Sequence, residues 1–313
     1  MINWGILGLG KMGMTFAVAL EETNNSILTA IASKSGKKFK NFENHSYENL
    51  MRREDIDAIY ISTLNNTHVD LIKQISKFGK KILCEKPVSL SLEDLIELNN
   101  LFNKEDIQFY EAIAYYSHPQ TSEITSILEK YSLGEIKSIE CNFGFKARFK
   151  PTSRLFDKSL GGGSIFDLGC YPISFFMLFA KNYEKISIIS KSVSYAENNV
   201  DDEAKLILNY DNKFEGKLNV SLKNNLNNVC KIICKNGYIK INEPWLPGQK
   251  TSIEISVNDH YFVNTINSNL SIYANQIQKV SESFINPNKE INLFDINKSI
   301  INMKLITSWL KKN

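Results

Sequence analysis

Short apolar runs alternate with longer amphipathic stretches over the first part of the chain. The runs are too short for buried helices and predict strands at 2–7, 27–32, 56–62, 81–85 and 107–112. The stretches between them show helical spacing, as in 67–78 and 91–102. Strands that alternate with such helices pair in parallel through right-handed crossovers. We therefore predict an α/β domain with a doubly wound parallel sheet over residues 1–115.

The rest of the chain, residues 116–313, follows a different pattern. From 185 to 241, strand-like runs follow one another with turn residues between them, including the hairpin dipeptide Asn236-Gly237. Strands joined in this way form a largely antiparallel sheet, which can leave one face open for a partner subunit. A further strand is expected at 136–143. Helices are expected at 120–131, after 161–163, near 271–284 and at 297–310. The pattern predicts an α+β domain with a large open sheet, whose last helix is free to pack back near the first domain.

The turn after the first strand is rich in glycine. Gly8-Leu9-Gly10-Lys11-Met12-Gly13 lies between that strand and an apolar helix start. Strand, G-x-G-x-x-G and helix is the order that a dinucleotide pyrophosphate needs. Gly8 permits the tight turn, Gly10 lets the backbone approach phosphate, and Gly13 lets the helix pack on its strand. The free N–H groups of the helix start favour an anion, and we predict dinucleotide binding here.

The end of the second strand bears on the choice of cofactor. An acidic side chain at this place favours NAD by binding the ribose 2′-hydroxyl. No Asp or Glu occurs between Ser26 and Phe42, and Ser33, Lys34 and Lys38 occur instead. A hydroxyl and ammonium groups suit a 2′-phosphate, so NADP is preferred over NAD. A solvated, lysine-rich helix start is the alternative interpretation.

Composition narrows the class of protein. The net charge of +3 is too small to indicate nucleic acid or an anionic membrane as the main partner. No apolar run is long enough for a membrane span, and the first strand begins without an export signal. Five cysteines form an odd number in a long chain and fit a reducing compartment, so a cytoplasmic location is expected. The four histidines lack metal-ligand spacing, and no metal is predicted.

Two stretches carry side chains suited to chemistry. Lys86, in Glu85-Lys86-Pro87, follows the fourth strand of a sheet whose ligands bind at the carboxyl ends of the strands. A lysine there can polarise a carbonyl or alkoxide. Asp167 and Tyr171 are four apart at the start of an apolar helix and project from one face. Taken alone, Lys86 can be a surface lysine and Asp167 a helix cap.

Taken together, these motifs resemble the glucose–fructose oxidoreductase, inositol dehydrogenase and MocA (Gfo/Idh/MocA) family of NAD(P)-dependent oxidoreductases. The resemblance covers nearly the whole chain. It is carried by the glycine turn, by 62–68, by Glu85-Lys86-Pro87, by 111–119 and by the stretch from Gly161 to Pro172, with its G-G-G-S-x-x-D-x-G-x-Y-P pattern. It implies a Rossmann domain and an α/β domain whose open sheet often forms the oligomer interface. Tyr171 replaces the histidine of many members, which is similar to the dihydrodiol dehydrogenase branch.

The resemblance also implies roles for particular residues. Lys86, Tyr171 and Asp167 are the expected catalytic residues, and the Lys86–Pro87 bond is expected to be cis. The substrate is expected to contact Lys86, Tyr116, Arg154, Asp167 and Tyr171, with His118 as a further candidate. The expected cofactor contacts are Gly8, Gly10, Lys11, Met12, Gly13, Ser33, Lys34, Lys38, Thr63, Leu64, Asn65, His68, Glu85, Lys86, Pro87 and Glu111.

The implied reaction is hydride transfer between the nicotinamide and a carbinol or carbonyl carbon. The expected substrate is a sugar, a cyclic polyol or a trans-dihydrodiol, and the expected assembly is a homodimer or homotetramer formed through the second sheet. An NAD-dependent sugar or inositol dehydrogenase of the histidine type is the first alternative. A nucleotide-sensing protein without turnover is the second. A methyltransferase would leave Lys86-Pro87 and the antiparallel second half unexplained.

Overall fold

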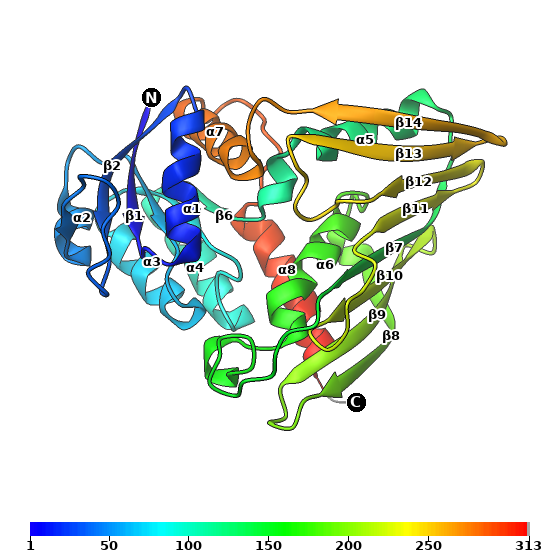
Figure 1. The fold of residues 1–313 in the computed structure, drawn as a ribbon, viewed down its shortest axis with the longest axis horizontal. Coiled ribbons are helices and arrows are strands. Elements are labelled where there is room, and N and C mark those ends of the chain that lie inside the picture. Colours follow the sequence, from blue (N-terminus) through cyan, green and yellow to red (C-terminus); the bar gives the residue numbers. More distant parts are fainter. Residues whose placement is uncertain (312–313) are drawn as a thin grey trace. The chain divides into compact units, whose positions relative to one another are not determined.

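A computed structural model describes residues 1–311. These residues form two compact units, each with its own sheet (Figure 1). The first unit contains Met1–His118 and Asn269–Ile300, and the second contains Pro119–Ser268 and the chain from Ile301 onward. The predicted functional domains, 1–115 and 116–313, stay a prediction. The compact units differ from them by placing 269–300 in the first unit.

The first unit is built on a parallel sheet in the order β3-β2-β1-β4-β5-β6. This is the doubly wound arrangement that the sequence predicts, with one short additional strand, β3. Its strands are β1 (Ile2–Leu7), β2 (Ser26–Ala32), β3 (Asn44–His45), β4 (Ala58–Ile61), β5 (Lys81–Cys84) and β6 (Phe109–Glu111). Its helices are α1 (Lys11–Ala19), α2 (Tyr47–Arg52), α3 (His68–Ser76), α4 (Leu92–Glu105), α7 (Ile272–Ile285) and the start of α8 (Ile296–Leu310).

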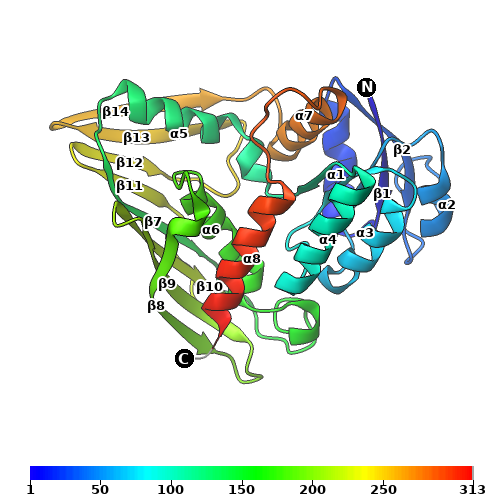
Figure 2. The ribbon, with the colours of Figure 1, turned by 180° about the vertical axis from the view of Figure 1, so that it is seen from behind.

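Helix α7 belongs to the first unit although it lies far along the sequence. The Trp4 indole N–H donates to Ser281 Oγ at 3.0 Å, and the Asn25 amide donates to the Gln278 carbonyl at 2.9 Å. The Trp4 ring also packs on Phe284, so α7 closes the core beside α1 (Figure 2). Burying the indole supplies part of the hydrophobic free energy that holds this helix on the sheet.

The second unit is built on an eight-stranded sheet in the order β14-β13-β12-β11-β7-β10-β9-β8. Only the β7–β10 pair is parallel, so the sheet is mostly antiparallel, as the sequence predicts. Its strands are β7 (Ile136–Gly144), β8 (Ile186–Tyr195), β9 (Asp201–Tyr210), β10 (Phe214–Ser221), β11 (Cys230–Cys234), β12 (Gly237–Ile241), β13 (Lys250–Val257) and β14 (His260–Asn267).

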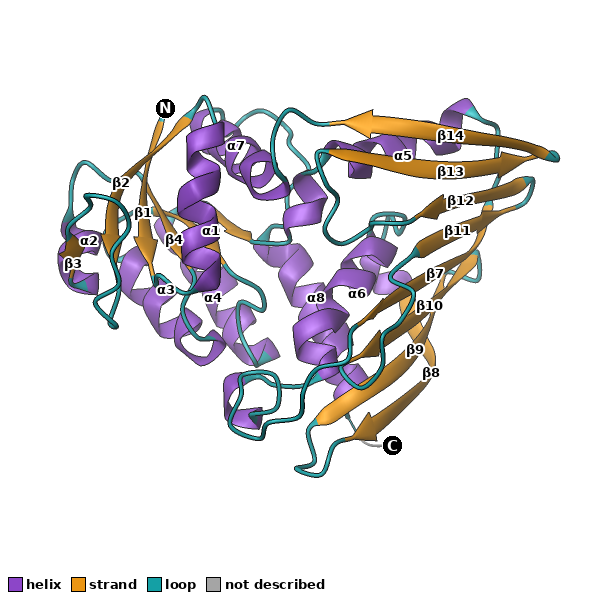
Figure 3. Ribbon diagram, in the orientation of Figure 1, coloured by secondary structure: helices purple, strands orange, loops and turns teal. Residues whose placement is uncertain are grey.

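The two faces of this sheet differ. Helices α5 (Pro119–Lys130) and α6 (Cys170–Met177), with the end of α8, cover one face (Figure 3). The opposite face carries polar cross-strand pairs: Lys217 with Glu140 at 3.2 Å, Asn219 with Asn142 at 2.7 Å, and Lys240 with Glu254 at 3.1 Å. Cross-strand pairs of this kind stabilise a sheet whose face is open to solvent.

Two further findings apply to residues 1–311. No helix there is both long enough and apolar enough to cross a membrane. That part of the chain also contains no cluster of three or more His, Cys, Asp or Glu side chains placed to hold a metal ion.

Candidate active site

The glycine turn has the shape that a bound pyrophosphate requires. Gly8 has φ of +94°, and a Cβ there would lie 2.8 Å from the Ser62 carbonyl oxygen. A Cβ on Gly13 would lie 2.0 Å from the Gly8 carbonyl oxygen, so only glycine lets α1 approach β1 so closely. At Gly10 the nearest heavy atom would be 4.0 Å away. The backbone at Gly10 is therefore accessible from outside the fold.

The start of α1 is suited to an anion. Gly10 is its N-cap and provides no side chain to accept from the first-turn N–H groups, and the first turn contains no acidic residue. Lys11 and Met12 are the first two helical residues. The uncapped N–H groups and the positive end of the helix dipole thus point to the place predicted for phosphate. These features fit a dinucleotide.

The loop after β2 is held by side-chain hydrogen bonds. The Ser33 backbone N–H donates to Asn44 Oδ1 at 2.8 Å, and the Asn44 amide donates back to the Ser33 carbonyl at 3.1 Å. The Ser33 and Ser35 hydroxyls are 2.9 Å apart. The Lys34 ammonium lies 5.5 Å from the centre of the Tyr47 ring. This loop therefore presents hydroxyls and an ammonium at the carboxyl end of β2.

Lys38 lies further along the same loop and is exposed. No helix forms between Ser33 and Asn44, so the lysines lie in a loop rather than at a helix start. The helix start of the alternative interpretation is therefore wrong, while a solvated lysine-rich segment agrees with the exposure of Lys38. The contact of these lysines with a cofactor stays a prediction.

His68 joins the ends of two strands. Its ring is fully buried at the start of α3, with Nδ1 3.0 Å from the Pro87 carbonyl oxygen and Nε2 3.3 Å from the Thr63 carbonyl oxygen. Burial lowers the pKa of His68 to about 4, so the ring is neutral at physiological pH and donates from one nitrogen. His68 therefore links the backbone after β4 to the backbone after β5, and its role as a cofactor support stays a prediction. The predicted contacts Leu64 and Asn65 follow Thr63, the first half exposed and the second buried.

The turn that carries Lys86 is anchored on both sides. The Tyr60 hydroxyl donates to Glu85 Oε1, and the Lys86 backbone N–H donates to Glu85 Oε2 at 3.3 Å. The Lys86–Pro87 bond is cis, as the resemblance implies. Because the Tyr60 ring is fully buried on β4, Glu85 has a fixed place beside the lysine.

Glu111 lies next to this turn at the end of β6. Its Oε1 accepts from the Val88 backbone N–H at 3.4 Å, and Ser299, whose hydroxyl donates to the Asp295 carbonyl at 3.1 Å, lies beside it. Its side chain is buried, and this burial raises its pKa to about 7, while Ser299, Val88 and the charge of Lys86 act in the opposite direction. A carboxyl group that titrates near neutral pH therefore lies beside the predicted active-site lysine.

In the second unit, a buried carboxylate shapes the segment that leads into α6. Asp201 Oδ2 accepts from the Ser164 hydroxyl at 2.8 Å and from the Ile165 backbone N–H at 2.7 Å. Gly163 has φ of +121°, and a Cβ there would lie 2.1 Å from Asp201 Oδ1. The third glycine of the motif is thus required by Asp201. Residues Ile165–Gly169 then form a π-helical turn that continues into α6, a geometry that is frequent at functional sites.

Asp167 and Tyr171 have distinct surroundings in this unit. Arg154 Nη1 donates to Asp167 Oδ1 at 2.7 Å, and the aspartate is 8% exposed against 50% for the arginine. The Tyr171 ring packs edge-on against Phe143, with ring centres 5.2 Å apart, and against Trp245 at 6.0 Å. The phenol of Tyr171 therefore lies beside two aromatic rings. The structure brings the predicted pair Arg154 and Asp167 into direct contact.

The remaining predicted substrate contacts belong to the first unit. Tyr116 is buried, with its ring edge-on to Phe294 at 5.4 Å, and His118 is fully buried. Their contact with substrate stays a prediction. The sequence did not indicate Asp201, Asn44, Ser299 or Trp245. Of their surroundings, only Gly163 gives a sequence signal, because a glycine is often needed where another group approaches the backbone closely. The glycine does not identify Asp201 as that group.

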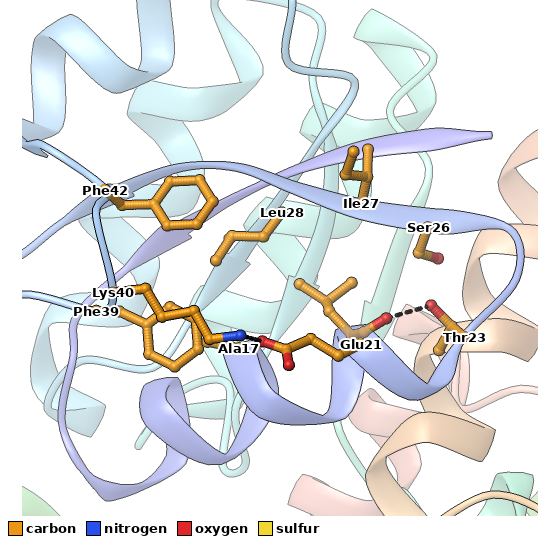
Figure 4. A pocket seen from close by; sticks show the side chains of 10 residues that line it. Ala17, Glu21, Thr23, Ser26, Ile27, Leu28, Phe39, Lys40 and Phe42 are labelled. Atoms are coloured by element: carbon orange, nitrogen blue, oxygen red, sulfur yellow. Dashed lines mark hydrogen bonds and ion pairs between the residues drawn. The ribbon is translucent and has the colours of Figure 1, made fainter.

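A cavity of about 410 Å³ in the first unit lies elsewhere, between the end of α1, β2 and the segment around Phe39 and Phe42 (Figure 4). Its rim carries the Lys40–Glu21 ion pair. None of the predicted cofactor or catalytic residues lines it. The predicted cofactor residues therefore lie outside this cavity, at the carboxyl ends of the first unit's strands.

These features define a class of protein: an α/β chain with a parallel sheet built for a dinucleotide and a second unit with a mostly antiparallel sheet. Residues 2–113 match the model of an oxidoreductase family with an NAD-binding Rossmann fold, and residues 121–240 match the GFO/IDH/MocA C-terminal domain. The chain belongs to the Gfo/Idh/MocA oxidoreductase family, with its NAD-binding Rossmann domain at the N-terminus.

Individual relatives agree with this membership. The chain is 32% identical over 271 residues to a trans-1,2-dihydrobenzene-1,2-diol dehydrogenase of Xenopus tropicalis, covering 83% of this chain and 80% of the relative. A 3-ketoreductase of Actinomadura kijaniata, solved with NADP and TDP-benzene, has a TM-score of 0.87 at 21% identity over 98% of this chain and 96% of that one. An aldose-aldose oxidoreductase of Caulobacter crescentus, solved with glycerol, has a TM-score of 0.86 at 16% identity over 98% and 96%. The two structures show that the fold is shared.

Proposed function

We propose that the protein is a dehydrogenase or reductase of CH–OH groups that prefers NADP, with Lys86, Asp167 and Tyr171 carrying the reaction. One observation carries this proposal. A lysine turn braced by Glu85 and Glu111 ends β5 in a dinucleotide-binding unit, and a tyrosine lies at the head of α6 in the other unit. Membership of an oxidoreductase family supports it.

The cofactor would be held by the ends of the first unit's strands. The glycine turn and the first turn of α1 receive the pyrophosphate, and Ser33, Lys34 and Lys38 receive the ribose end. Because these residues offer hydroxyls and ammonium groups, they suit a 2′-phosphate. The remaining predicted cofactor contacts, from Thr63 to Glu111, are proposed for the nicotinamide half.

Side chains of this protein transfer the substrate's hydroxyl proton and stabilise the charge on its oxygen. When bound, the nicotinamide ring supplies the hydride donor or acceptor. Tyr171 takes the hydroxyl proton during oxidation and returns it during reduction. An unperturbed tyrosine has a pKa of about 10, so it needs a nearby cation at neutral pH, and the Lys86 ammonium is proposed for that role. Arg154 fixes one oxygen of Asp167, and the carboxylate is proposed to orient Lys86 or a substrate hydroxyl.

The proposed substrate is a cyclic polyhydroxylated compound: a sugar, a cyclic polyol or a trans-dihydrodiol. Phe143 and Trp245 support a ring, because their faces and edges offer apolar contact beside the phenol of Tyr171. The similarity to trans-1,2-dihydrobenzene-1,2-diol dehydrogenases supports the dihydrodiol among these. We further propose a cytoplasmic homodimer or homotetramer formed through the open face of the second sheet.

The test is nicotinamide absorbance with NADP and with NAD, across aldoses, inositols and cyclic diols. Wild type is expected to turn over one substrate group, faster with NADP at equal concentration. Lys86→Ala should lose turnover by about 10² or more, while Lys81→Ala, at the start of the preceding strand β5, should keep it. Equal loss in both lysine variants would contradict the role of Lys86. Tight NADPH binding without turnover of any substrate would favour the second candidate, a nucleotide sensor.

A further inference from the structure

We propose that Glu111 is a positioning residue that fixes the Lys86 turn through the Val88 backbone, and that its ionised form is the one that supports turnover. This inference rests on the proposed function, because it concerns the state of Lys86 during the reaction. Glu111 acts through the turn and through Lys86, and it needs no contact with substrate.

The geometry ties Glu111 to the turn that carries Lys86. Cys84 and Glu111 are paired at the ends of β5 and β6, so the carboxyl group lies beside the first residues after β5. Glu111 Oε1 accepts from Val88 N–H, two residues after Lys86. The Glu111 backbone N–H donates to the Phe294 carbonyl at 2.8 Å, which fixes the end of the strand. Because Glu111 is held by its backbone N–H as well as by its carboxylate, it restricts the position of the Lys86 turn.

The surrounding groups favour a titratable carboxyl over a permanently ionised one. Glu85 and Lys86 face it from the turn, Cys84 from the end of β5, and Ser299 from α8. Glu85 is itself occupied by Tyr60 and by the Lys86 backbone. Burial and the charge of Glu85 raise the pKa of Glu111, whereas its hydrogen bonds and Lys86 lower it, with a result of about 7. Small changes in pH near neutrality therefore change the charge beside Lys86.

The groups that surround the Glu111 carboxyl are suited to its ionised form. A backbone N–H can only donate, so the Val88 N–H favours the charged carboxylate, and the Ser299 side chain acts in the same direction. When Glu111 takes up a proton, Lys86 loses a counter-charge and Val88 loses a charge-assisted acceptor. The turn is then less constrained, and Lys86 is less well placed for a substrate oxygen. Turnover should rise as pH rises through the pKa of Glu111.

The decisive experiment is the pH profile of kcat in the reducing direction. Tyr171 acts there as an acid, and an acid alone gives a profile that only falls at high pH. Wild type should show an additional rising limb with an apparent pKa of about 7, and Glu111→Gln should lack it. Glu97→Gln, an exposed carboxylate on α4, should keep the limb. A rising limb with an unchanged midpoint in Glu111→Gln would overturn the proposal, as would a kcat lowered equally at every pH.

A second variant tests the direction of the effect. Ser299→Ala retains Glu111 but removes a neighbouring hydroxyl that lowers the pKa of Glu111. The rising limb should therefore move to higher pH while NADPH affinity stays within about twofold. A limb that moves to lower pH, or does not move, would contradict the assignment of this limb to Glu111.

A measurement without substrate separates the two proposals. The folded protein holds the Glu111 proton up to pH about 7, against an ordinary value of 4.5, so this proton stabilises the fold at low pH and its contribution is lost as pH rises. The difference in Tm between wild type and Glu111→Gln should fall across this range. If no substrate is reduced but this trend appears, the proposed function fails and the titration of Glu111 stands. If the Tm difference is constant, the inference about Glu111 fails.

Discussion

Each of the two segments proposed to carry the chemistry is held by one buried carboxyl group, and the two carboxyls are held differently. In the first unit, Glu111 contacts the Lys86 turn through a single backbone N–H, that of Val88, and the nearby Ser299 hydroxyl donates to the Asp295 carbonyl. In the second unit, the Asp201 carboxylate accepts from the Ser164 hydroxyl and from the Ile165 backbone N–H. Both are buried, but Asp201 has more donors.

The difference separates a fixed support from a titratable one. Burial raises the pKa of both carboxyls, and each hydrogen bond from a donor lowers it again. Glu111 also faces a second carboxylate, Glu85, and its pKa is about 7. Asp201, on β9, faces donors from the segment that leads into α6 and acts as a cap for it. We therefore expect the tyrosine segment to keep its shape across neutral pH and the lysine turn to respond to it.

The largest expected effect tests which segment carries the proton. Tyr171→Phe keeps the ring against Phe143 and Trp245 but removes the hydroxyl. Turnover should fall by about 10² or more, because a positioned acid or base contributes that much. Steady-state kinetics measures turnover and a binding titration measures NADPH affinity separately. NADPH affinity should be unchanged. Tyr131→Phe, on the turn after α5, is the control. Wild-type turnover in Tyr171→Phe would remove Tyr171 from the mechanism.

The next effect tests whether Asp201 is a rigid support. Gly163→Ala places a Cβ 2.1 Å from Asp201 Oδ1 at a φ of +121°. Both the overlap and the backbone strain should lower the free energy of unfolding, together by about 2–4 kcal/mol. Gly36→Ala is the matched control, because φ is +68° there and no atom lies within 4 Å. It should cost about 1 kcal/mol. Denaturant unfolding measures both, and equal costs would show that the contact with Asp201 is unimportant.

The same comparison explains how far the sequence could lead. The periodicity of hydrophobic residues and the turn residues predicted both sheets, because these patterns depend on residues close together in the sequence. They also predicted that Gly8, Ser33, Thr63, Lys86 and Glu111 follow strands of one parallel sheet, whose carboxyl ends share an edge. Resemblance to a family supplied the expected roles of Lys86, Asp167 and Tyr171, and those roles remain proposals.

The supports of the site could not be predicted, because each depends on a contact between distant parts of the chain. Asp201 is 38 positions after Gly163, and nothing in the sequence predicts that these two residues are in contact. Ser299 meets Glu111 only because α8 begins in the first unit, after the whole second sheet. Charge at a strand end is a local property, but burial and donor number are not. For that reason the sequence indicated Glu111 as a cofactor contact and did not indicate its raised pKa.

The smallest effect expected separates the two carboxyls most directly. Asp201→Asn removes the charge from a carboxylate whose Oδ2 accepts from the Ser164 hydroxyl and the Ile165 backbone N–H, so both bonds lose their charge-assisted strength. Stability should fall by about 1–2 kcal/mol, measured by denaturant unfolding, and kcat should fall modestly through a less ordered start of α6. Its rising pH limb should be that of wild type, because Glu111, to which the limb is assigned, is intact. A limb that disappears in Asp201→Asn as it does in Glu111→Gln would mean that the two carboxyls act together, and the distinction between a fixed and a titratable support would be wrong.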